Sequence, residues 1–176
     1  LTYKLSEEGP RPSFVGNFIP PKITRVLHRG SPENPRDEVL PSAPKILQGA
    51  LGVEGDASGH VRRARLADRV VDSSNPLTAR VMANRIWQHV FGTGLVVTGG
   101  DFGRAGALPS HPELLDWLAA EFSSPSRPEG TPWSMKEFIR LLVTSDAFRR
   151  SSAPSAIGLE KDAGSIFLWR FPPRRV

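Results

Sequence analysis

Two histidines and an aspartate are the residues of this chain best suited to bind a metal ion. They are His89, Asp101 and His111, which a loop between two helices would bring together. Their spacing matches no compact metal motif such as His-x-x-x-His or His-Glu-x-x-His. A histidine just ahead of Pro112 is also typical of a helix start. We therefore expect no metal site, and no cofactor in this chain.

A second group of polar and aromatic residues lies within one expected helix. Asn84, Arg85 and Trp87 place an amide, a guanidinium and an indole close together. Arginine and tryptophan are common anchors of binding surfaces. One interpretation is a ligand or partner surface that these three residues share with Asp101 and His111. The other is that Arg85 pairs with Asp101 or Asp116 and that Asn84 caps a neighbouring loop.

Comparison with three known catalytic or phosphate-binding motifs reveals none of them in complete form. Asp101-Phe-Gly resembles the metal-binding tripeptide of protein kinases, but the glycine-rich loop, Val-Ala-Ile-Lys and His-Arg-Asp are absent. A turn capped by the Asp101 side chain explains it better. The glycine-dense segment 92–106 lacks the Gly-Lys-Ser/Thr ending of a phosphate loop, and no Gly-x-Ser-x-Gly is present. The sequence thus contains no recognisable catalytic motif, and whether the chain is an enzyme stays open.

The helix that would position Asn84 has clear end signals. Asn75 is a typical N-cap, Pro76 suits the first helical position, and Gly92 follows Phe91 where a helix can end. Apolar residues recur at steps of three and four, which predicts one buried stripe. The stripe consists of Ala79, Met82, Ile86 and Val90.

Two further helices are predicted from paired Ser and Glu residues three positions apart. Ser110 with Glu113, and Ser134 with Glu137, form the capping-box pattern. In the first of these helices we expect Asp116 and Glu121 on the solvent side. The expected buried residues are Leu114, Leu115, Leu118 and Phe122 in the first, and Phe138, Ile139, Leu142 and Val143 in the second.

The flanks of this helical region are rich in turn-forming residues. Segment 23–29 alternates and is rich in β-branched residues, which predicts a short strand with one buried face, ending at the turn formers of 30–35. A short helix is expected over 61–71. After Arg150 we expect a loop, then an apolar segment, 166–169, that packs on a surface. The expected domains are an extended proline-rich arm (1–60), a helical core (61–150) and a C-terminal loop and docking segment (151–176).

Composition and charge restrict the class of protein further. The 176 residues contain no cysteine, which excludes disulfides, cysteine-ligated metals and covalent haem within this chain. There is neither a signal peptide at the start nor an apolar run long enough for a membrane span. The net charge is +5, and six arginines between His60 and His89 form a basic cluster. Such a cluster either contacts a polyanion or pairs with carboxylates. The arginines are residues 62, 63, 65, 69, 80 and 85.

Several blocks of sequence resemble the planctomycete-specific PSD-one domain, a family of unknown function. The resemblance covers most of the chain from about residue 23 onward. An upstream part runs from Val26 to Gly30 and from Pro41 to Leu47. The later blocks are Asn75-Pro-Leu-Thr-Ala-Arg through Trp87-Gln-His, Phe91-Gly-Thr-Gly-Leu-Val, Asp101-Phe-Gly, His111-Pro-Glu-Leu-Leu-Asp-Trp-Leu-Ala, Trp133-Ser, Thr144-Ser and Leu168-Trp-Arg-Phe-Pro-Pro-Arg-Arg.

The resemblance implies a context but no catalytic residues. Family members resemble large exported proteins with a companion domain upstream, often a cytochrome c domain at the start, and a further helical region after the Arg-Arg block. This chain carries no Cys-x-x-Cys-His and looks like a fragment of such a protein.

From the residues and the resemblance together, we expect a mainly α fold: a three-helix core with an extended, Pro/Gly-rich N-terminal arm that holds a short strand pair. The expected function is that of an interaction or scaffold module in an exported, cytochrome c-linked protein. Its partner would be another protein or the flanking domains of the same polypeptide. The alternatives are a fragment of an enzyme of polysaccharide breakdown or electron transfer and, as the weaker one, a nucleic-acid-binding module.

Overall fold

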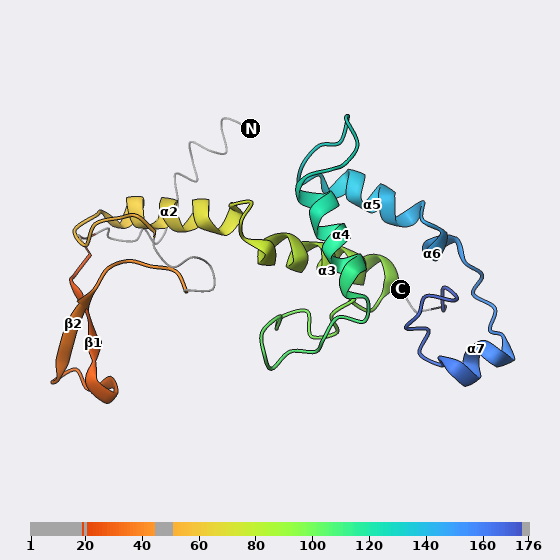
Figure 1. Cartoon of the computed structure of the whole chain (residues 1–176), viewed down its shortest axis with the longest axis horizontal. Coiled ribbons are helices and arrows are strands. Elements are labelled where there is room, and N and C mark those ends of the chain that lie inside the picture. The colour runs from red at the N-terminus through yellow and green to blue at the C-terminus, as the bar shows by residue number, and fades with distance from the viewer. Residues whose placement is uncertain (1–18, 20, 45–50, 174–176) are drawn as a thin grey trace, which may run out of the picture. The chain divides into compact units, whose positions relative to one another are not determined.

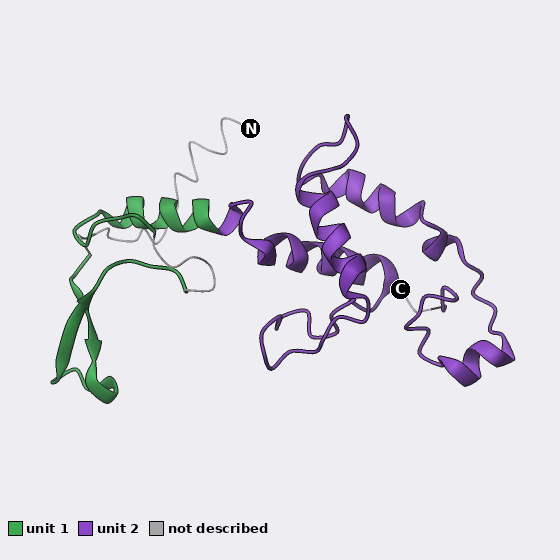
Figure 2. Ribbon diagram, viewed as in Figure 1, with its two compact units in different colours: residues 1–69 green, residues 70–176 purple. Residues whose placement is uncertain are grey.

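The structure is a computed structural model that describes residues 19, 21–44 and 51–173. It divides into two compact units, residues 1–69 and residues 70–176 (Figure 2). In the described residues six α-helices and one two-stranded antiparallel sheet are present (Figure 1). The fold is therefore mainly α with a small strand pair, as the sequence predicts.

The strand pair of the first unit is a hairpin. Strand β1 (Thr24–Leu27) pairs antiparallel with β2 (Pro35–Val39), with Thr24 opposite Val39 and an irregularity between Arg25 and Leu27. The short 3-10 helix η1 (His28–Gly30) makes the turn, where Arg29 and Gly30 both have positive φ. The expected buried face is wrong, because every residue of both strands is exposed. Alternation predicts a strand, but only another layer of structure can bury one of its faces.

Helix α2 (Gly59–Val71) extends the expected short helix by two residues at its start. The Arg62 side chain ties the helix to the preceding loop by donating to the backbone carbonyls of Ala57, at 3.0 Å, and of Gly55. Arg65 lies 3.8 Å from Asp68, one turn along the same helix. These arginines are thus used locally, for carbonyl and carboxylate bonding.

Helix α3 (Pro76–Phe91) begins and ends where its capping residues predict. The Asn75 side chain accepts a hydrogen bond from the Leu77 N–H, and Pro76 occupies the first turn, where its missing N–H leaves no bond unmade. Gly92 has a φ of 92°, and its N–H donates to the Gln88 carbonyl. The expected stripe faces the core, with Ala79 and Ile86 buried and Met82 and Val90 partly buried.

Helix α4 (Pro112–Ser123) begins differently from the prediction. Its N-cap is His111, whose side chain makes no capping bond, so the expected capping box of Ser110 and Glu113 is wrong. The Ser110 hydroxyl instead meets His111 Nδ1 at 3.0 Å, and its backbone N–H donates to the Leu95 carbonyl. Pro112 in the first turn makes a capping bond less necessary.

The buried face of α4 also includes one residue expected on the solvent side. Glu121 is only 8% exposed, and its carboxylate accepts the Ser126 N–H at 3.0 Å and lies 3.7 Å from Arg127. The loop after the helix folds back over Glu121 and supplies partners that sequence spacing does not reveal. Leu115, Leu118 and Phe122 are buried as expected, and Leu114 is partly buried.

Helix α5 (Met135–Val143) has the expected N-cap, since Ser134 Oγ accepts from the Glu137 N–H. The Glu137 carboxylate accepts from the N–H and hydroxyl of Thr131, at 2.9 and 3.2 Å, so it fastens the preceding loop to the helix. Phe138 and Leu142 are buried, but the expected burial of Ile139 is wrong, because 40% of its surface is exposed.

Two short helices precede the C-terminal segment: α6 (Asp146–Arg149) and α7 (Ala156–Lys161). The sequence predicts only a loop after Arg150, so α7 was missed. Its N-cap is Ser155, whose hydroxyl accepts from the Gly158 N–H at 3.0 Å.

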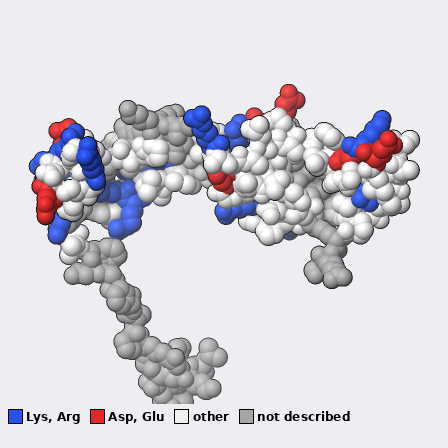
Figure 3. Space-filling model, turned by 90° about the horizontal axis from the view of Figure 1, so that it is seen from below, with Lys and Arg blue, Asp and Glu red and all other residues white. Residues whose placement is uncertain are grey.

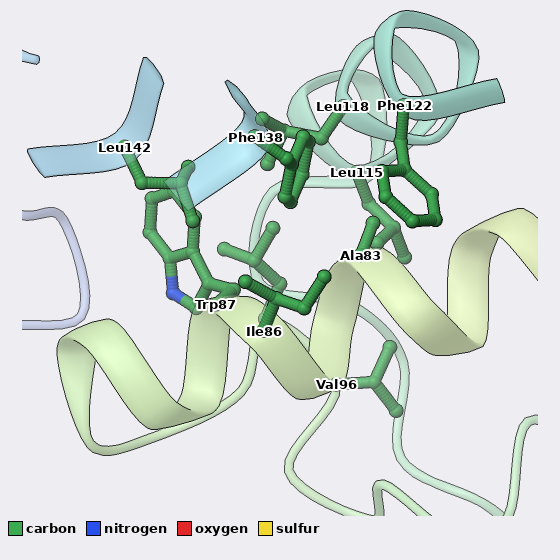
Figure 4. Close-up of a cluster of buried hydrophobic side chains, with 10 residues drawn as sticks. Ala83, Ile86, Trp87, Val96, Leu115, Leu118, Phe122, Phe138 and Leu142 are labelled. Atoms are coloured by element: carbon green, nitrogen blue, oxygen red, sulfur yellow. The ribbon is translucent and has the colours of Figure 1, made fainter. Parts of the chain in front are cut away.

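The core of the second unit lies between α3, α4 and α5 (Figure 4). Leu95 and Val96, from the loop between α3 and α4, complete it and are each 2% exposed. Aromatic rings extend the packing: Trp87 stacks on Phe91 at 4.0 Å, and Phe91 contacts Phe148 and Phe171 at 6.1 and 5.9 Å. These contacts attach the C-terminal segment to the helical core.

We expect Leu118→Ala to lower the free energy of unfolding by about 2–5 kcal/mol, because it leaves a cavity at a fully buried position. Urea denaturation followed by far-ultraviolet circular dichroism measures the change. Leu108→Ala is the matched control, since Leu108 is exposed and its truncation should change stability by no more than about 0.5 kcal/mol. Equal effects of the two substitutions would contradict this core.

We expect Glu137 to make stability dependent on acid pH. The backbone N–H of Thr131 holds the pKa of the Glu137 carboxyl below its ordinary value of 4.5. A carboxyl whose pKa is lower in the folded state stabilises the fold above its unfolded pKa, and this contribution is lost as pH falls through the folded pKa. The stability advantage of wild type over Glu137→Gln should therefore shrink below about pH 4.5. Denaturation at several pH values tests this, with Lys136→Gln as control. A constant difference would contradict it.

Candidate interaction surface

Asn84 is the most deeply buried of the residues singled out from the sequence, with an exposed fraction of 0%. Its amide makes two hydrogen bonds to one backbone unit: Nδ2 donates to the Val96 carbonyl at 3.0 Å, and Oδ1 accepts from the Val96 N–H at 2.9 Å. This amide therefore holds the loop after α3 against the helix. The interpretation in which Asn84 caps a neighbouring loop describes this geometry.

Gly94 fits against the same amide. A Cβ atom at this position would lie 2.9 Å from both Asn84 Nδ2 and Oδ1, and 2.6 Å from the Val96 carbonyl oxygen. The last atom belongs to the backbone, so a larger residue would require the loop to move. Gly94 is therefore needed for the close approach of this loop to α3.

Trp87 also belongs to the interior. Only 4% of its surface is exposed, and Figure 4 shows it among the buried core side chains. Its ring stacks on Phe91 at an interplanar angle of 18°. Asn84 and Trp87 thus contribute to the core of the second unit and expose almost nothing to a partner.

Arg85, Asp101 and His111 lie nearer the surface, in three different settings. Arg85 is exposed on α3, and Asp116 forms its ion pair with Arg80, at 2.6 Å. Asp101 Oδ1 accepts from the Gly103 N–H at 2.8 Å, which confirms the predicted turn. The half-buried His111 ring meets Phe167 edge-on, with centroids 6.1 Å apart.

Metal and polyanion binding receive no support from the described part of the chain. There, no group of three or more His, Asp or Glu residues is placed to hold a metal ion. Of the arginine cluster, Arg62 bonds to carbonyls and Arg65 and Arg80 lie beside carboxylates. Figure 3 shows Lys and Arg spread over the visible face, with Asp and Glu among them.

An apolar groove in the second unit is the feature that sequence reasoning missed. It has a volume of about 200 Å³ and is bounded by the C-terminal end of α3, the loop after it, α6 and residues 164–172. Aromatic and aliphatic side chains make up most of its lining, including Phe91, Val97, Leu108 and Phe171. Its lining comes from residues between 87 and 110, from Ala147 and from residues between 164 and 172, so no local pattern could reveal it.

The rim of the groove carries exposed apolar side chains, which we call the apolar patch: Val97, Leu108, Ile166 and the adjoining Phe167. Val97 is 68% exposed, Leu108 89% and Phe167 71%. Segment 166–169 was expected to pack on a surface, yet of its apolar side chains Leu168 packs against the core while Ile166 and Phe167 remain exposed. Several exposed apolar side chains beside one groove are typical of interaction sites.

One charged residue, Arg170, lines this groove. Its Nε donates to Ser165 Oγ at 2.9 Å, and its guanidinium carbon lies 5.0 Å from the centroid of the Trp169 ring. The Trp169 indole in turn donates to the Asp162 carbonyl at 2.9 Å. The guanidinium is therefore held in place at the edge of an apolar cavity.

The described residues form a mainly α structure with an apolar groove, and the polar side chains buried in it are hydrogen-bonded. Among the described residues, no buried side-chain nitrogen or oxygen lacks a hydrogen-bond partner. None of the described helices is both long and apolar enough to cross a membrane.

The chain belongs to the PSD1 family, described as a protein of unknown function (DUF1553), whose family model matches residues 62–176. This match includes the three core helices and both walls of the groove, and it confirms the family resemblance. No curated protein matches the chain, and no solved structure matches it either.

We expect Asn84→Ala to lower the free energy of unfolding by about 2–5 kcal/mol, because it leaves the buried N–H and C=O of Val96 without partners. Arg85→Ala, one residue along the helix and exposed, should change it by no more than about 0.5 kcal/mol. Urea denaturation of both variants measures the difference. An unchanged stability of Asn84→Ala would show that its amide does not hold the loop.

Proposed function

We propose that this chain is an interaction module of a larger exported, cytochrome c-linked protein, and that its apolar groove binds a flanking region of the same polypeptide. The observation that carries this proposal is the groove with its exposed apolar patch. The exported, cytochrome-linked context comes from the family resemblance.

The exposed side chains of the apolar patch would supply the free energy of binding. Burying a Val, Leu, Ile or Phe side chain contributes about 1.5–3 kcal/mol relative to leaving it exposed. Val97, Leu108, Ile166 and Phe167 each have more than half of their surface exposed. A partner that covers all four would gain several such contributions.

The choice of an attached partner follows from the groove's position in the chain. One wall is formed by residues between 164 and 172. The family resemblance implies that this segment leads into the Arg-Arg block and a further helical region. A segment attached to the same chain is present at a high effective concentration, so a small patch is sufficient to hold it.

The alternative functions have weaker support. An enzyme fragment for polysaccharide breakdown or electron transfer rests on family context. Of the polar side chains that line the groove, Ser165 and Arg170 bond to each other. Nucleic-acid binding rests on arginines of which Arg62, Arg65 and Arg80 already have local partners.

The 176 residues contain no cysteine, so a single cysteine introduced among them can be followed at its own site by labelling. We expect Cys in the variant Leu108→Cys to react with a maleimide at least about tenfold more slowly in the longer native polypeptide than in the 176-residue chain, since a docked partner excludes the reagent. Site-resolved mass spectrometry measures the two rates. Met135→Cys, at an exposed position outside the groove, should react equally fast in both. Equal rates for Leu108→Cys would overturn the proposal.

A further inference from the structure

We infer that the segment bound in the apolar groove carries a carboxylate that pairs with Arg170. This inference rests on the proposed docking function and adds the chemistry of the partner. Arg170 is the one charged residue among the described residues that line this mostly apolar groove.

Arg170 is held so that its two terminal nitrogens stay available. Its Nε is occupied by Ser165 Oγ, and the plane of Trp169 supports the guanidinium. In the described part of the chain, no acidic side chain forms an ion pair with it. Two parallel N–H groups are the arrangement that binds a carboxylate bidentately.

The backbone around Arg170 has an unusual conformation. Ser165 and Leu168 both have positive φ, 54° and 56°, which L-residues rarely adopt. Each such residue costs free energy and persists only where its surroundings hold it. Here the Asp162 carboxylate accepts hydrogen bonds from the N–H groups of Ile166 and Phe167, at 3.0 and 2.8 Å. These bonds close the loop between Asp162 and Ile166. The segment is thus a rigid support for Arg170.

The size of the groove favours protein side chains over a free small molecule. Pockets for small ligands usually measure about 300–1,000 Å³, and this groove has about 200 Å³. One or two apolar side chains fill such a space, while the rest of their segment covers the apolar patch.

The positive charge of Arg170 sets a requirement for the charge of the bound segment. A partner that covers the groove also removes water from Arg170, and an isolated buried charge is strongly unfavourable. An Asp or Glu next to the apolar anchor would pair with Arg170 and offset part of that penalty. The docking segment is therefore acidic as well as apolar.

Two peptides test this on the 176-residue chain: N-acetyl-Glu-Leu-Phe-amide and its Gln counterpart. We expect the Glu peptide to bind about fivefold more tightly than the Gln peptide, as for a well-formed, partly exposed ion pair. Titrations followed by NMR of the tryptophan indole N–H groups measure both dissociation constants. About 0.3 M salt should reduce the preference.

Arg170→Gln should abolish the preference for the Glu peptide, whereas Arg149→Gln, an exposed arginine outside the groove, should retain it. Equal affinity for the two peptides, a preference that persists in Arg170→Gln, or no binding of either peptide would overturn the inference. Tighter binding of 4-phenylbutyrate than of the Glu peptide would assign the groove to free carboxylic acids and overturn it as well.

The two proposals fail separately. If Leu108→Cys is protected in the longer polypeptide but the peptides show no charge preference, docking stands and only the acidic partner is refuted. If Leu108→Cys is not protected, the docking function fails whatever the peptides do.

Discussion

The pair of hydrogen bonds between the Asn84 amide and the backbone of Val96 is the constraint on which the second unit depends. It fixes an otherwise glycine-rich loop to the side of α3. Leu95 and Val96 can then close the core, while the next residue, Val97, is exposed at the groove rim. One buried amide thus shapes both the interior and the exposed surface.

Because the Asn84 amide is buried, its hydrogen bonds select one conformation of the loop. A buried polar group is favourable only when its hydrogen bonds are made, and both of those required here are supplied by a single backbone unit. Any shift of the loop would break both bonds at once. Gly94 supplies the space, because a side chain there would meet the amide and the Val96 carbonyl. Polar bonding and close packing therefore select the same loop conformation.

The opposite wall of the groove depends on aromatic packing. Phe91, at the end of α3, contacts Phe148 and Phe171, which are themselves 4.9 Å apart. These rings attach the C-terminal segment, and with it Arg170, to the helical core. Two interactions therefore form the groove. The buried Asn84 amide holds the loop after α3, and the aromatic cluster holds the C-terminal segment, both beside the C-terminal end of α3.

The three core helices and most of their buried faces are predictable from the sequence alone. Their signals are local: Asn75, Pro76 and Ser134 act within one turn, and apolar spacing follows the helical period. It also revealed the family and the turn at Asp101. The burial of Glu121 and the uncovered faces of β1 depend on the tertiary arrangement, as does the placement of Asn84 and Trp87 in the interior while Leu108 and Phe167 are exposed. Burial depends on which distant segments meet, and residue type and spacing along the chain do not contain that information.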